Sequence, residues 1–211
     1  MANFEGRNVA DVIDGTNGAD VIAGFRGDDT LTGLGGEDIV LGGAGQDVIN
    51  GDGGPGATGA ADRLYGEDGD DTINGQDGND KLFGGDGNDT LNGGLGNDTL
   101  KGGNSADVLD GGEGDDRLYG GGDADSLAGG TGADLFVFRL GDTLVSAFDT
   151  VSDFERGTDK LDIADAAFTQ SVQGMNTLLS LDFDNNGSFE SQILVNGDTP
   201  LTASDFLAPP T

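Results

Sequence analysis

The apolar positions of this sequence recur with a fixed spacing of nine residues over most of its length. From Gly6 to Val137 the repeat reads G-x-x-G-x-D-x-U-x, with U apolar, and the spacing is broken once, between Gly51 and Asp62. Because side chains alternate between the two faces of an extended chain, each repeat predicts a minimal strand with one inward-pointing residue. The U position is filled by Ile13, Ile22, Leu31, Val40, Ile49, Leu64, Ile73, Leu82, Leu91, Leu100, Leu109, Leu118, Leu127 and Phe136.

One inward side chain per repeat cannot form a core by itself, but stacked repeats can. Each strand then pairs with its neighbours, and the aliphatic positions become a continuous column. The Gly positions allow positive φ, so that the chain turns tightly and directs loop carbonyls inward. The pattern therefore predicts an all-β solenoid of short parallel strands.

The sixth position of the repeat is Asp throughout. These residues are Asp11, Asp20, Asp29, Asp38, Asp47, Asp62, Asp71, Asp80, Asp89, Asp98, Asp107, Asp116, Asp125 and Asp134. Carboxylates and loop carbonyls offered by two stacked loops form an oxygen-only donor set, which suits a hard cation such as Ca²⁺ better than Zn²⁺ or Cu²⁺. The alternative, that these residues are solvated turn formers, is disfavoured by their regularity.

Two consecutive repeats carry a specific resemblance. Residues 84–92 read Gly-Gly-Asp-Gly-Asn-Asp-Thr-Leu-Asn, and residues 93–101 read Gly-Gly-Leu-Gly-Asn-Asp-Thr-Leu-Lys. They resemble the nonapeptide of the RTX (repeats-in-toxin, hemolysin-type calcium-binding) family. The resemblance implies a right-handed parallel β-roll with two nonapeptides per turn. It also implies Ca²⁺ ions between loops two repeats apart, held by Asp carboxylates and by carbonyls of loop positions one to four.

On this resemblance, the metal-binding carboxylates are those of the sixth-position Asp residues from Asp20 to Asp134. The expected carbonyl donors are Gly66, Asp68, Gly69, Gly75, Asp77, Gly78, Gly84, Gly85, Asp86, Gly87, Gly93, Gly94, Leu95, Gly96, Gly111, Gly112 and Gly114. Val9, Ser105 and Asp123 replace the fourth-position Gly, and the first repeat is degenerate, which puts metal binding there in doubt. The irregular loop 51–61 leaves local occupancy open.

Composition strengthens the case for a bound cation. The 211 residues include 42 Gly, 40 Asp or Glu and only 9 Lys or Arg, giving a net charge of −31. Such a chain buries too little apolar surface to fold unaided, so a cation that neutralises the carboxylates is expected to stabilise it. The negative field argues against nucleic acid and anionic membranes as partners.

The same composition argues against catalysis. The sequence contains no His and no Cys, which excludes a Ser-His-Asp triad, a His- or Cys-ligated zinc site and a cysteine nucleophile. No catalytic residue is predicted, and the protein is expected not to be an enzyme. No apolar run approaches the roughly 20 residues of a membrane-spanning helix.

The period stops after Val137, which divides the chain into a calcium-binding β-roll (1–137) and a C-terminal cap (138–211). An open-ended solenoid needs such a cap. Residues 149–163 resemble the cap of serralysin-type proteases and mannuronan epimerase R-modules, in which catalysis belongs to a separate upstream domain. Residues 182–188 copy the front of an EF-hand loop, but position twelve is Ile193, which favours a hairpin turn over an additional Ca²⁺ site.

The chain ends near Asp205-Phe206-Leu207-Ala208, which resembles the tail of type I secretion substrates, and Met1–Gly6 do not resemble a signal peptide. We therefore expect export through an ABC transporter. The self-repelling chain would stay unfolded at low cytosolic calcium and fold in extracellular calcium.

One outer face combines aromatic and basic residues. Two nonapeptides per turn would align Tyr65, Phe83, Lys101 and Tyr119, flanked by Arg63, Lys81, Thr99 and Arg117, with Arg139 just beyond. This strip could bind an acidic polysaccharide or a cell surface, or the cap could fold over it.

The leading prediction is a secreted calcium-binding protein with a structural or binding role. The alternatives are a calcium-dependent adhesin and an accessory module of a secreted enzyme.

Overall fold

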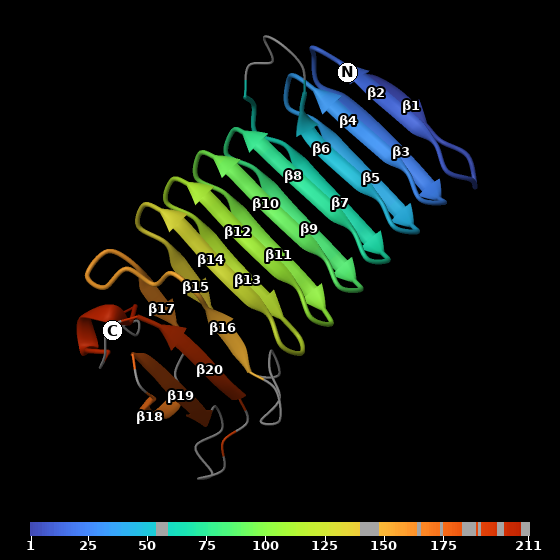
Figure 1. Cartoon of the computed structure of the whole chain (residues 1–211). Helices are drawn as coiled ribbons and strands as arrows, with labels where there is room; N and C mark the ends of the chain where they lie inside the picture. The colour runs from blue at the N-terminus through green and yellow to red at the C-terminus, as the bar shows by residue number, and fades with distance from the viewer. Residues whose placement is uncertain are drawn as a thin grey trace.

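The computed structural model describes residues 1–53, 59–139, 148–163, 166–173, 175–182, 189, 191–197 and 201–207. Three sequence features therefore lie wholly or partly outside the described residues: positions 54–58 of the irregular loop, positions 183–188 of the EF-hand-like segment, and Ala208. The described chain forms a long, flattened solenoid whose two faces are β-sheets (Figure 1).

Successive strands alternate between the two sheets. The first sheet contains β1 (Ala2–Glu5), β3 (Asp20–Arg26), β5 (Ile39–Ala44), β7 (Arg63–Asp68), β9 (Lys81–Asp86), β11 (Thr99–Asn104), β13 (Arg117–Gly121), β15 (Leu135–Val137) and β17 (Lys160–Asp162). The second contains β2 (Val12–Thr16), β4 (Thr30–Leu34), β6 (Val48–Asp52), β8 (Thr72–Asp77), β10 (Thr90–Leu95), β12 (Val108–Glu113), β14 (Ser126–Thr131), β16 (Asp149–Val151), β20 (Ser191–Asn196), β19 (Asn176–Asp182) and β18 (Ala167–Gln173).

The register confirms two nonapeptides per turn. Leu91 pairs with Leu109 one turn later in the second sheet, and Leu82 pairs with Leu100 in the first, each 18 residues apart. At the irregular loop the offset grows, so that Ile49 pairs with Ile73. The wider spacing does not change which strands pair, and the predicted parallel β-roll is confirmed.

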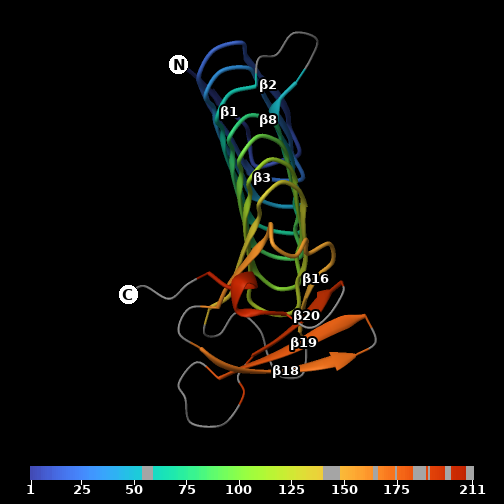
Figure 2. The same ribbon diagram turned by 90° about the vertical axis from the view of Figure 1, so that its left-hand side faces the viewer.

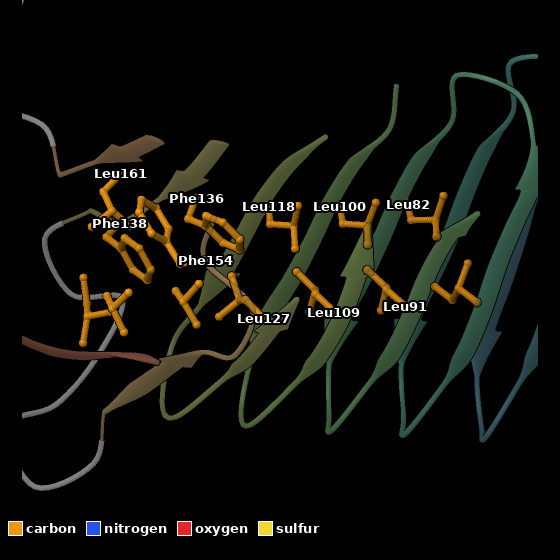
Figure 3. Packing of buried hydrophobic residues seen from close by; sticks show 14 of the residues in the cluster. Leu82, Leu91, Leu100, Leu109, Leu118, Leu127, Phe136, Phe138, Phe154 and Leu161 are labelled. Carbon is orange, nitrogen blue, oxygen red and sulfur yellow. The ribbon is translucent and has the colours of Figure 1, made fainter. Parts of the chain in front are cut away.

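The core is one column of side chains from each sheet. Figure 3 shows Leu82, Leu100 and Leu118 facing Leu91, Leu109 and Leu127, and these residues are at most 1% exposed. Each such side chain contributes about 1.5–3 kcal/mol by leaving water. The column opens at the N-terminal end, where Ile13 and Phe4 are only partly buried.

A β-rich cap closes the other end, as predicted. The parallel ladder continues past Val137 into β16 and β17, and β20, β19 and β18 follow, with β19 antiparallel to both neighbours. Figure 2 places β18 and β19 at the end opposite the N-terminus. Phe136 and Phe154 pack with ring centroids 6.1 Å apart and seal the column.

The only helix among the described residues is the 3-10 turn η1 (Ala203–Asp205), so none is long enough to cross a membrane.

Replacing Leu100 by Ala should lower the free energy of unfolding by about 2–5 kcal/mol, because the narrow column cannot collapse around the lost volume. The measurement is equilibrium denaturation in saturating calcium. The control is Val108→Ala, whose side chain is 49% exposed on the outer face and which should cost less than about 1 kcal/mol. Equal losses at the two positions would contradict a core carried by the inner column.

Candidate metal site

The sixth-position Asp residues form two buried columns along the corners of the roll. From Asp20 to Asp134 they are at most 3% exposed, so they are not solvated turn formers. Each lies at or just before the start of a strand, and its counterpart in the next turn comes 18 residues later, as Asp89 follows Asp71, except across the irregular loop, where Asp71 follows Asp47 by 24 residues. Asp149 and Asp159 continue the columns into the cap, although their spacing breaks the nonapeptide period.

One carboxylate oxygen of each Asp is engaged in a hydrogen-bond ladder. The backbone N–H of Asp71 donates to Oδ1 of Asp89 at 2.8 Å, and that of Asp80 donates to Oδ1 of Asp98 at 2.7 Å. The same bond recurs along the roll, from Ala2 and Asp20 to Asp134 and Asp159. Sequence reasoning assigned these Asp residues to metal binding alone and missed this structural role.

The second carboxylate oxygen has no such partner in the interior turns. It is buried without a hydrogen bond in Asp29, Asp38, Asp47, Asp62, Asp71, Asp80, Asp89, Asp98, Asp107, Asp116 and Asp134. A buried, unpaired carboxylate oxygen is strongly unfavourable unless a cation or a proton neutralises it. These positions are therefore where the chain needs a positive partner.

Loop carbonyls share the space into which this oxygen points. A Cβ added to Gly75 would lie 2.5 Å from Oδ2 of Asp80 and 2.6 Å from the carbonyl oxygen of Gly93, one turn later. The carboxylate and the next turn's carbonyl thus converge beside a residue that has no side chain. This oxygen-only cradle fits Ca²⁺, and the Asp residues with the carbonyls of the two loops would hold the ion.

Positive φ angles shape the loops around these oxygens. Gly85 and Gly87 have φ of +126° and +130°, and a Cβ on either would overlap the carbonyl oxygen of Glu67 or Gly69 in the previous turn. Phe25, Leu34, Glu67 and Gln76 accept the same strained conformation with φ between 76° and 81°. The carbonyls predicted as ligands lie in these loops, and their assignment as ligands stays a prediction.

The two ends of the roll differ from its interior. Oδ2 of Asp20 accepts hydrogen bonds from the backbone N–H and the Oγ1 of Thr16, both at 2.7 Å. Oδ2 of Asp11 accepts from the N–H of Arg7, and Oδ2 of Asp159 accepts from the N–H of Glu155. Asp20 was predicted as a ligand, but its loop already supplies the donors that interior loops lack.

No group of three or more acidic side chains converges on one point in the described part of the chain. This agrees with sites that take one or two carboxylates and complete their coordination with carbonyl oxygens.

Burial raises the pKa of the interior carboxyls. Desolvation is the largest cause, and the charges of neighbouring turns add to it. The pKa rises to about 8 for Asp107, to about 7 for Asp80 and Asp98, and to about 6 for Asp38 and Asp116. At the N-terminal end the pKa of Asp20 is lowered instead, because hydrogen bonds from Thr16 and Ala2 outweigh desolvation.

The aromatic and basic strip is arranged as predicted, on the outer face of the first sheet. Tyr65 and Phe83 stack with centroids 4.7 Å apart, and Nζ of Lys101 lies 5.6 Å from the Phe83 ring and 5.0 Å from the Tyr119 ring. Arg117, beside Tyr119, lies 3.9 Å from Asp162 of β17. The rings of this strip stack on one another and on Lys101 and Arg117, which is what a structural ladder on the outer face also requires.

The comparisons agree with this geometry. The family described as RTX calcium-binding nonapeptide repeat matches residues 5–40, 24–55, 57–91, 65–100, 83–118 and 101–136. No curated protein matches the sequence significantly.

Solved structures show similar chains. One subunit of the Azotobacter vinelandii mannuronan C5-epimerase is 27% identical, with a TM-score of 0.37, over 70% of this chain and 93% of that subunit. A second subunit of that enzyme is 24% identical, with a TM-score of 0.33, over 74% and 82%. The extracellular lipase LipA from Serratia marcescens is 18% identical, with a TM-score of 0.23, and this chain spans 40% of it.

The raised pKa values predict how pH acts on the calcium-free protein. A folded-state pKa above the ordinary 3.8 means that the folded chain holds more protons than the unfolded chain between about pH 4 and pH 8. The stability of the calcium-free roll therefore falls as pH rises through that window. Far-UV circular dichroism of calcium-free protein should show more β-structure at about pH 4.5 than at about pH 8.

The matched control is the same pH series in saturating calcium, where the order reverses because protons compete with the ion for the carboxylates. A calcium-free spectrum that is unchanged across the range would contradict the burial of unpaired carboxylates.

Proposed function

Because the chain belongs to the RTX calcium-binding nonapeptide repeat family, we propose that it binds several Ca²⁺ ions between the turns of its β-roll and folds on binding them. The observation that carries this proposal is the row of buried Oδ2 atoms that have no hydrogen-bond partner. A hard cation satisfies these oxygens together with the loop carbonyls. Since the ion binds the folded state, its binding free energy becomes folding free energy.

The role is that of a structural or binding module without catalytic activity of its own. The repeats occupy 1–137, and the segment 138–211 adds the last turns and the cap. Supporting this, the sequence offers no His or Cys for acid–base, nucleophilic or zinc chemistry. Apart from Asp52, the carboxyl groups with raised pKa values lie in the repeated columns rather than in a single cleft.

Calcium titration of chelated protein at neutral pH, followed by far-UV circular dichroism, should convert a coil spectrum into β-structure cooperatively. Magnesium should fail at the same concentrations, because it demands octahedral geometry and gives up its water reluctantly. A chain that is fully folded in chelator, or that folds equally well with magnesium, would refute calcium-dependent folding.

The same titration on the variant Asp98→Asn tests whether the second carboxylate oxygen of a column Asp binds calcium. The amide oxygen keeps the hydrogen bond from the N–H of Asp80, while the negative second oxygen is lost. The variant should therefore need more calcium to fold, whereas Asp110→Asn, which removes an exposed carboxylate, should titrate like the parent. Equal midpoints for all three proteins would argue that Asp98 serves the ladder alone.

We also propose that the protein is secreted through a type I pathway, with the tail near 205–207 as part of its signal. In the folded chain Asp205 is 1% exposed and pairs with Arg156 at 3.5 Å, and the N–H of Leu207 donates to the carbonyl of Leu161 at 2.8 Å. Phe206 stacks on Phe168. Folding thus docks Asp205 and Phe206 against the cap, so that this part of the tail is fully available to a transporter only in the unfolded chain, which fits export of the calcium-free chain.

In cells that carry a type I exporter, deletion of 201–211 should keep the chain inside the cell, while the full chain reaches the medium. Immunoblots of medium and cells measure the two fractions. Cells without the exporter provide the control for leakage. Equal release of the truncated and full chains would show that the tail is not the signal.

A further inference from the structure

Asp52 is a buried carboxylate that the nonapeptide pattern does not include. It ends β6, where it pairs with Leu34 of β4, and it occupies the second position of the loop that the six added residues interrupt. The interior loops on either side place Gly, or a strained residue such as Leu34 or Gln76, at this position with positive φ, whereas the two N-terminal loops have Arg7 and Thr16 there without it. Asp52 is not among the residues with positive φ.

The side chain of Asp52 is buried, and the backbone N–H of Asp77 lies near its carboxylate without reaching full hydrogen-bond geometry. The residue is 2% exposed, and both Oδ1 and Oδ2 are buried without a hydrogen bond. This differs from the column residues, each of which gives one oxygen to the ladder. Burying such a carboxylate is strongly unfavourable unless a cation lies beside it.

Its carboxylate lies among the ligands expected at this corner. The charge of Asp52 acts on the carboxyls of Asp38, Asp62 and Asp80, which belong to three consecutive turns of one column. Beside it, a Cβ on Gly51 would lie 2.5 Å from Oδ2 of Asp62 and 2.7 Å from the carbonyl oxygen of Gly75. Asp52 therefore borders an oxygen cradle of the same kind as those in uninterrupted loops.

The interruption explains why a carboxylate is needed here. A Cβ on Gly78 would overlap the carbonyl of Ala60, so the fourth position of the broken loop keeps its place in the stack. In the sequence, however, the six added residues separate that position from Asp52, whereas a regular loop places the fourth position two residues after the second. A short acidic side chain at the break can supply the oxygen that the regular loop backbone supplies elsewhere.

We propose that Asp52 is a calcium ligand outside the nonapeptide pattern, and that its carboxylate retains, with Asp62 and loop carbonyls, an ion at the interrupted loop. The inference rests on the proposed function. It extends that function by assigning a ligand, and a filled site, to the loop where the repeat fails.

Native mass spectrometry in saturating calcium should count one Ca²⁺ fewer on Asp52→Asn than on the parent protein. The control is Glu37→Gln, which removes an exposed charge from the loop one turn earlier and should keep the full count. Equal counts on the parent and Asp52→Asn would overturn the inference while leaving the proposed function intact. A parent protein without bound calcium would refute the proposed function itself.

If the Asp52→Asn variant fails to fold, a measurement on the parent protein still tests the inference. Anomalous diffraction from calcium-loaded crystals should place an ion about 2.3–2.6 Å from a carboxylate oxygen of Asp52. Ions at neighbouring loops with none at that distance from Asp52 would show that the residue is buried for another reason.

Discussion

The backbone N–H of each column Asp donates to a carboxylate oxygen one turn later, and this bond ties every turn of the roll to the next. In the interior turns each such bond also draws a negative charge into the roll, and the second oxygen of Asp89, Asp98, Asp107 and Asp116 has no hydrogen-bond partner there. An isolated buried carboxylate is tolerated only when it is protonated or paired. The ladder that builds the roll therefore creates the demand for a cation, and stacking and ion binding are two consequences of one residue.

Hydrophobic burial alone cannot offset the free-energy cost of folding this chain. The core is only two side chains thick, one from each sheet, whereas the chain must order 42 glycines, which lose more backbone entropy than any other residue. The net charge of −31 opposes compaction further. On the proposed function, the ion supplies the free energy that a thicker core supplies in an ordinary domain, which makes the folded state conditional on calcium.

The sequence predicts most of the roll because each repeated position has a single structural meaning. The inward column, the parallel register and the burial of Asp follow from the nine-residue period, as Leu91 and Asp89 illustrate. The hydrogen-bond ladder could not be read from the sequence, since a sequence does not distinguish the two oxygens of one carboxylate. Asp149 and Asp159 were missed as members of the columns because they follow spacings of 24 and 25 residues.

The ends and the interruption show how an aperiodic residue can serve a periodic fold. At the ends, loop N–H groups of Arg7, Thr16 and Glu155 reach the second carboxylate oxygen, so those turns satisfy their own charge. Interior loops differ at their second position, which has positive φ in Phe25, Leu34 and Gln76, for example. In these loops no backbone N–H of the loop donates to the second carboxylate oxygen, which stays unpaired. Asp52 occupies the second position without positive φ and brings a charge rather than an N–H group to the corner. A buried carboxylate at the interrupted corner thus increases the local demand for a cation, so that a residue outside the repeat pattern can serve the same physical need as the repeated ones.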